Sequence, residues 1–63
     1  MSNTVEQLKQ HFADFLAENE KFEAGNNAAG TRARKALQEV TKGVKARRSE
    51  ISEEKNARKA AKG

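Results

Sequence analysis

Residues 25–35 read Gly25-Asn26-Asn27-Ala28-Ala29-Gly30-Thr31-Arg32-Ala33-Arg34-Lys35, and they separate two parts of the chain that differ in composition. Residues 1–24 carry five acidic and two basic side chains, together with all three phenylalanines. Residues 25–63 carry four acidic and eleven basic side chains and no aromatic residue. The net charges are 2 − 5 = −3 and 11 − 4 = +7, which sum to +4. This polarity predicts an acidic polymer or surface as the partner of the second part.

The sequence before Gly25 predicts an amphipathic helix over about residues 4–24. Asn3 or Thr4 can cap its first turn, and Gly25 accepts the left-handed backbone conformation that ends a helix. At 100° per residue, the large apolar side chains fall within one arc of roughly 120°. We therefore expect the following side chains to form a core, within the chain or in an oligomer: Val5, Leu8, Phe12, Phe15, Leu16 and Phe22.

A second helix is predicted over about residues 27–60. Asn26, Asn27 and Thr31 are all plausible N-caps, and we prefer Asn27. Small residues follow (Ala28, Ala29, Gly30, Ala33 and Ala36), which would let this helix approach Phe15 and Phe22 closely. The larger core positions expected in this helix are Leu37, Val40, Val44 and Ile51. Beyond Ile51 the apolar pattern stops, so residues 52–63 are expected to form a basic overhang or a frayed tail.

These patterns predict an all-α protein, a single small helical domain over residues 1–63 that folds as an antiparallel two-helix hairpin. A chain of this length buries too little surface to be very stable alone, and small domains usually need disulfides, a metal or oligomerisation. There is no cysteine and only one histidine, so disulfides and a metal site are not expected. We therefore expect a homodimer, or a higher homo-oligomer, that forms a helical bundle.

The cations of the second helix are expected to gather on one flank. Between Arg34 and Arg48 this flank is free of acidic residues over roughly 20 Å. Lys and Arg side chains neutralise phosphates and release counterions, so such a flank is typical of nucleic-acid binding, although solvated helix surfaces can also be basic. The predicted contact residues are Arg32, Arg34, Lys35, Lys42, Lys45 and Arg48, with Asn26, Asn27 and Thr31 near a phosphate at the helix start.

Enzyme functions are not indicated. The chain has no Cys, a single His and no glycine-rich phosphate loop, so it offers no nucleophile–base pair and no cofactor motif. No cofactor, small-molecule substrate or metal is expected. There is also no apolar run of the ~20 residues that a membrane span requires. We therefore expect no membrane partner, and a cytoplasmic location.

The corner segment resembles a known family. Chlamydial-type bacterial histone-like proteins, which are named for their likeness to linker histones, carry a Gly-Asn-Lys-Ala-Ala-(Gly/Ala)-x-Arg-x-Arg segment between two helices. The matching positions here are Gly25, Asn26, Ala28, Ala29, Gly30, Arg32 and Arg34. The resemblance implies sequence-independent DNA binding and a nucleoid-associated protein that compacts DNA.

Two departures from the family pattern affect this expectation. Asn27 stands where a Lys is common, and the Lys/Ala-rich tail of larger members is reduced to Lys59-Ala60-Ala61-Lys62. Compaction would then come from the helical body and its oligomer, by coating, bridging or bending duplex DNA. The residues leave two alternatives open, namely a helical oligomerisation or protein-interaction module and an RNA-binding protein.

Overall fold

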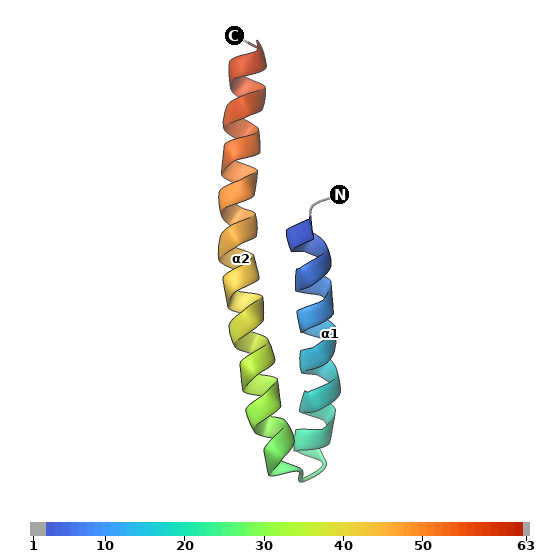
Figure 1. Ribbon diagram of the computed structural model, residues 1–63. Helices are drawn as coiled ribbons and strands as arrows, with labels where there is room; N and C mark the ends of the chain where they lie inside the picture. The colour runs from blue at the N-terminus through green and yellow to red at the C-terminus, as the bar shows by residue number, and fades with distance from the viewer. Residues whose placement is uncertain (1–2, 63) are drawn as a thin grey trace.

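The computed structural model describes residues 3–62, with side chains through residue 60, and forms a two-helix hairpin (Figure 1). Helix α1 spans Asn3–Glu23 and helix α2 spans Asn27–Lys62. The helices run antiparallel, and the described residues form no strand. The prediction of an all-α, two-helix hairpin is confirmed.

The corner contains three residues, and both helix ends are closed by hydrogen bonds. Gly25 has a φ of 110°. Its N–H donates to the Phe22 carbonyl at 2.9 Å, and the Asn26 N–H donates to the Lys21 carbonyl at 3.1 Å. This pair of bonds is a Schellman motif, which satisfies the last carbonyls of α1. The prediction that Gly25 ends the first helix is confirmed.

The start of α2 differs by one residue from the preferred prediction. The Asn26 side-chain oxygen accepts a hydrogen bond from the Ala29 N–H at 3.1 Å, so Asn26, and not Asn27, is the N-cap. The physical reason is the Schellman motif. It brings the residue after Gly25 directly to the helix start, which makes Asn27 the first helical residue and leaves Thr31 inside the helix.

We expect Gly25→Ala to lower the free energy of unfolding by about 1–2 kcal/mol, because a side chain is strained at positive φ. Gly25→Asn is the matched variant. It also adds a side chain, but asparagine tolerates positive φ better, so it should cost less. Urea unfolding followed by circular dichroism measures both, and equal costs for the two variants would contradict the backbone explanation.

The two helices meet along a seam with coiled-coil spacing. Inward positions recur at alternating steps of three and four residues, which are the a and d positions of a heptad labelled a to g. In α1 these positions are Thr4, Leu8, His11, Phe15, Glu18 and Phe22. In α2 they are Ala29, Ala33, Ala36, Val40, Gly43, Arg47 and Glu50. The e and g positions flank this seam on either side, and the b, c and f positions form the outer face of each helix.

Large side chains of α1 pack onto small residues of α2. A Cβ atom on Gly30 would lie 2.6 Å from Cδ1 of Phe22, and one on Gly43 would lie 2.7 Å from Cδ2 of Leu8. Real Cβ atoms do not approach other atoms so closely, so a side chain at either glycine would force Phe22 or Leu8 to shift. The expected close approach of the small residues to the first helix is therefore observed at Gly30 and Phe22.

A double-mutant cycle at Gly43 and Leu8 tests this packing. Replacing a helical glycine by alanine normally gains about 1 kcal/mol. We expect Gly43→Ala to gain less than that, or to destabilise, because its methyl group meets Leu8. In a Leu8→Ala background the same change should recover the full gain. Unfolding free energies of the four proteins give the coupling, and a coupling near zero would show that Leu8 does not press on Gly43.

A single hairpin buries little apolar surface. Among residues 3–60, only Ala29 and Ala33 are buried hydrophobic residues, at 0% and 5% exposure. Of the predicted core residues, Val5, Leu8, Phe15 and Val40 are half-buried between or beside the helices. The others are between 42% and 52% exposed in one chain: Phe12, Leu16, Phe22, Leu37, Val44 and Ile51. Phe22 packs on Gly30 within the chain with part of its ring exposed. A core role for the other five requires a second chain, and it stays a prediction.

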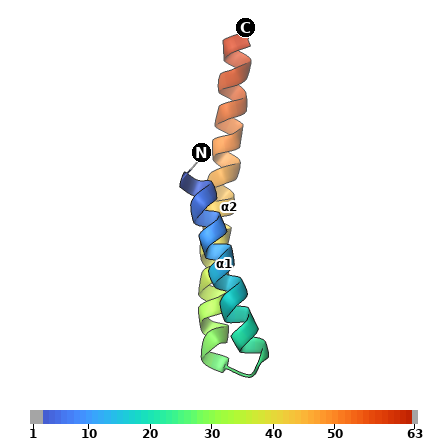
Figure 2. The same ribbon diagram turned by 90° about the vertical axis from the view of Figure 1, so that its right-hand side faces the viewer.

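Helix α2 continues well past the start of α1 (Figures 1 and 2). Glu50 lies level with the first turn of α1, since its carboxylate accepts a hydrogen bond from the Thr4 hydroxyl. The hairpin is 57 Å long and only 16 by 13 Å across. Residues 52–62 of the predicted overhang are helical, and Gly63 lies outside the described residues.

Candidate nucleic-acid interface

The outer face of α2, formed by its b, c and f positions, carries no acidic residue. The four acids of this helix all lie on the inward a and d positions or on the g flank: Glu39, Glu50, Glu53 and Glu54. The described outer face instead carries these cations: Arg34, Lys35, Lys42, Lys45, Arg48, Lys55 and Lys59. A helix of 36 residues is about 54 Å long, so the cations follow most of the molecule.

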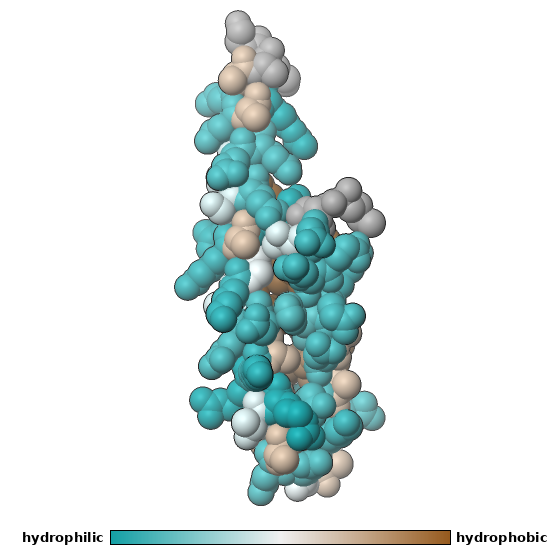
Figure 3. Space-filling model, viewed as in Figure 1, coloured by the Kyte–Doolittle hydropathy of each residue, from teal (hydrophilic) through white to brown (hydrophobic). Residues whose placement is uncertain are grey.

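Figure 3 shows one face of the hairpin, and hydrophilic residues cover both helices there. The surface therefore includes a broad polar region beside the seam. Among residues 3–60, the most hydrophobic colour in this view lies in the gap between the two helices, and paler patches lie near the corner and along the edges. Polar contact with a highly charged partner is compatible with such a surface.

The structure divides the six predicted contact cations into two groups. Arg32 bonds to Glu18 through Nε and Oε2 at 2.7 Å, and Lys42 lies 3.5 Å from Oε1 of Glu39. Within the described part of the chain, no ion pair involves the other four: Arg34, Lys35, Lys45 and Arg48. These four are exposed and project from the outer face. They are the cations with least competition from the protein's own acids.

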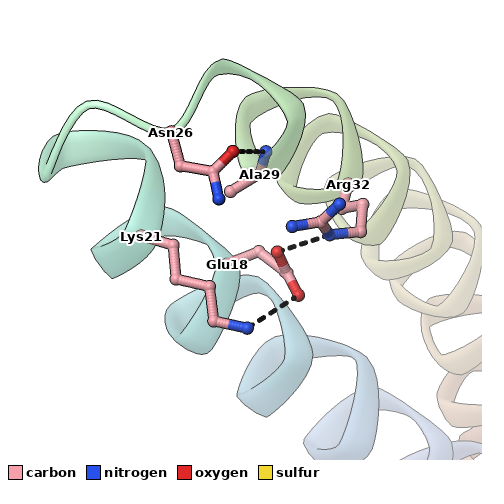
Figure 4. Close-up of polar contacts among 5 residues, drawn as sticks. All are labelled: Glu18, Lys21, Asn26, Ala29 and Arg32. Atoms are coloured by element: carbon pink, nitrogen blue, oxygen red, sulfur yellow. Dashed lines mark hydrogen bonds and ion pairs between the residues drawn. The ribbon is translucent and has the colours of Figure 1, made fainter.

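Glu18 links the two helices near the corner (Figure 4). Its carboxylate accepts the Arg32 hydrogen bond from α2 and lies 3.7 Å from Nζ of Lys21 in α1. The hydrogen bond from Arg32, with the positive charges of Arg32 and Lys21, holds the pKa of Glu18 below its ordinary value of 4.5. The contact of Arg32 with Glu18 thus stabilises the packing of α2 on α1.

We expect the Glu18 contact to make hairpin stability depend on acid pH. Because the folded-state pKa is lowered, the stabilisation is present above the unfolded value of 4.5 and is lost as pH falls through the folded value. Glu18→Gln should be less stable than the parent at pH 7 and should lose less stability below about pH 5. Urea midpoints measured from pH 7 to pH 3 give the two slopes.

Arg32→Gln serves as the control for this dependence. Because the Arg32 hydrogen bond is the largest cause of the lowered pKa, Glu18→Gln should change the acid slope much less in the Arg32→Gln background. If Glu18→Gln changed the acid slope just as much in the Arg32→Gln background, the pH dependence would come from a contact other than the one with Arg32.

Of the polar corner residues predicted to bind a phosphate, Thr31 lies beside two of the predicted contact cations. Asn26 uses its side-chain oxygen to cap α2, so that atom is engaged within the fold. Asn27 and Thr31 are exposed in the first two turns of α2. Thr31 lies beside Arg34 and Lys35 in a shallow surface hollow that Gln38 also lines. Contact of Asn26, Asn27 and Thr31 with a phosphate stays a prediction.

Sequence reasoning missed two features of this surface. The sequence predicted a basic overhang or a frayed tail for residues 52–63, whereas Lys55 and Lys59 continue the outer face on a regular helix. A seven-residue repeat could have shown this, because Arg34, Arg48 and Lys55 share one heptad position. Sequence reasoning also missed the pairing of Arg32 with Glu18, which are 14 residues apart and meet only because the helices pack in this register.

Other kinds of site have little support in the described residues. No group of three His, Cys, Asp or Glu side chains there could hold a metal ion. No helix of the described chain is long and apolar enough to cross a membrane. The fold and the charged surface define a small basic helical-hairpin protein.

Comparison with known families identifies the group. Residues 2–57 match the family described as histone H1-like protein Hc1, so the chain belongs to that family. The resemblance of the corner segment to bacterial histone-like proteins is thereby confirmed. No curated protein and no solved structure matches the chain.

Proposed function

We propose that this protein binds double-stranded DNA without sequence specificity, through contacts between the outer face of α2 and backbone phosphates. The observation that carries the proposal is the segregation of charge on α2. All four of its acids lie on positions nearer α1, whereas its b, c and f positions carry cations and uncharged residues. Membership of a histone H1-like family supports the same function.

The physical mechanism is phosphate neutralisation along one long, continuous helix. Each neutralised phosphate releases condensed counterions, which supplies affinity for any sequence. A helix of about 54 Å is as long as about 16 base pairs at ~3.4 Å per pair. Arg34, Lys45 and Arg48 lie at intervals along the middle of this helix. They would each meet a phosphate without any need to read base edges.

The cations predicted from the sequence to contact DNA are not expected to contribute equally. Arg34, Lys35, Lys45 and Arg48 form its centre, because no acid of the described chain pairs with them. Arg32 and Lys42 contribute less, since binding a phosphate would require Arg32 to leave Glu18 or Lys42 to leave Glu39. Lys55 and Lys59 extend the contact along the overhang. A protein of this kind would organise or compact DNA in the nucleoid and would need no catalytic residue.

We expect the triple variant Arg34→Gln, Lys45→Gln, Arg48→Gln to weaken duplex binding strongly. The slope of log K against log salt should fall in magnitude by about 2.7, which is about 0.9 for each of three phosphate contacts. Random and defined duplexes should be affected alike, because phosphates carry no sequence information. Fluorescence anisotropy at several salt concentrations measures the slope.

The matched control is the triple variant Arg32→Gln, Lys21→Gln, Lys42→Gln. It removes the same three charges, so both variants fall from +4 to 4 − 3 = +1. These cations are paired with Glu18 or Glu39, so the slope should change by much less. Equal losses in the two triple variants would mean that net charge alone determines binding. A flat salt response of the parent protein would refute phosphate binding itself.

The same assay separates DNA from RNA binding. Backbone charge is common to both polymers, and the outer face has no aromatic side chain on which unpaired bases could stack. Duplex DNA, duplex RNA and single strands are therefore compared at one salt concentration. Tighter binding to duplex RNA would favour the alternative of an RNA-binding protein.

A further inference from the structure

The hairpin has one apolar face that its own chain leaves exposed. In an antiparallel helix pair, the e positions of both helices lie on the same side of the seam and the g positions lie on the other. The g positions here are polar apart from Ala46 and Ala60. The e positions include Phe12 in α1, with Leu37, Val44 and Ile51 in α2, and Leu16 lies beside Phe12. These five side chains are between 42% and 52% exposed.

The spacing of this face is symmetric about one residue. Leu37 precedes Val44 by seven residues and Ile51 follows it by seven. Val44 also lies within one residue of the midpoint of α2, which spans residues 27–62. Two α2 helices that cross antiparallel at Val44 would therefore match Leu37 with Ile51 of the other copy. They would also overlap over almost their whole length.

The same register gives the overhang a place to bind. A groove of about 420 Å³ lies beside the corner, lined in part by Phe15, Phe22, Ala33 and Leu37. With Val44 opposite Val44 of the other copy, the numbers of any two opposed residues add up to 88. Residue 57 of one copy therefore lies opposite residue 31 of the other. Residues 52–62 of one copy would then pass over this groove of the other. Ala57 makes that part of the overhang narrow.

Charge complementarity supports this placement. Glu23 follows Phe12 by 11 residues, which is about 20° on the helix wheel, so it lies on the same flank of α1. Arg58 would lie opposite Gly30, level with the end of α1. Within the described residues, neither Glu23 nor Arg58 takes part in an ion pair. Each is exposed in the single chain and each could pair with the other across two copies.

We propose that a second copy of this chain covers the apolar face, with the two α2 helices antiparallel and crossing at Val44. The overhang of each copy fills the corner groove of the other. Such an interface is isologous, so both copies bury the same residues and the assembly closes as a two-fold dimer. The interface is centred on the e positions of α2, and Lys35, Lys45 and Arg48 stay outside it. Thr31 and Arg34, which also line the corner groove, lie at its edge.

Because the chain has no cysteine, single introduced cysteines report this geometry directly. Val44→Cys should form a disulfide-linked dimer under mild oxidation, since the two-fold axis brings position 44 of both copies together. Leu37→Cys and Ile51→Cys should each link poorly alone and should link efficiently when mixed. Ala46→Cys, on the exposed g flank, is the control and should not link. Non-reducing gels without DNA give the result.

The outcomes are distinct. Self-linking of Leu37→Cys and of Ile51→Cys, without cross-linking in the mixture, would indicate parallel α2 helices and overturn the proposal. Linking of Ala46→Cys as efficient as that of Val44→Cys would indicate random collision and overturn it too. A monomer in sedimentation equilibrium at micromolar concentration would also refute it. None of these results bears on duplex binding, which is measured separately.

A charge exchange tests the overhang independently of the cysteines. Glu23→Arg and Arg58→Glu should each weaken the dimer, and the variant that carries both changes should recover most of the loss, because the pair is restored with its charges reversed. Sedimentation equilibrium measures the dissociation constant of each. If the double variant did not recover the lost affinity, the overhang would not be part of the interface. The side chains lie at the surface, so helicity by circular dichroism should stay unchanged.

Discussion

The close packing of α1 on the small residues of α2 determines most of the other features of this hairpin. Phe22 lies over Gly30 and Leu8 over Gly43, where even one added methyl group would overlap the side chain above it. Packing at this distance sets the register between the helices. The register in turn brings Glu18 to Arg32 and Thr4 to Glu50. Apolar contact in the seam and polar contact at its edges therefore depend on the same small residues.

The seam also sorts the charges of the protein. Once the small residues turn toward α1, the acids of α2 lie on the seam or on the g flank, where they are near partners such as Arg47 and Lys42. The b, c and f positions of α2 face away from α1, and their cations Arg34, Lys35, Lys45 and Arg48 form no ion pair within the described chain. A cationic outer face thus arises from the orientation of one helix. It does not require a high net charge, which is only +4 for the chain.

Much of the fold could be predicted from the sequence. Gly25 and the neighbouring asparagines mark the corner because positive φ and helix capping need those residue types, and the apolar periodicity gives both helices to within a few residues. A helical-wheel projection of the sequence could not distinguish the residues of the seam from those of the exposed apolar face. The two lie side by side in one arc, so Phe15, which is half-buried, and Phe12, which is exposed, looked equivalent.

The candidate site was only partly predictable for a similar reason. The row from Arg34 to Arg48 follows from helical spacing, which is local. The state of Arg32 depends on Glu18 in the other helix, and no local pattern links residues 14 apart. The choice of Asn26 over Asn27 as the cap likewise depends on how the preceding helix ends.

The three-residue corner has a consequence for the way the chain folds. Contacts next to the corner, such as that between Phe22 and Gly30, close a loop of only a few residues, and each later contact along the seam adds a little to that loop. Chains dominated by such local contacts fold fast, on the microsecond to millisecond timescale, because little loop entropy is lost at each step. The hairpin would therefore close progressively from Gly25 towards Glu50. The free end of α2 would become ordered last, and only after the rest of the molecule had formed.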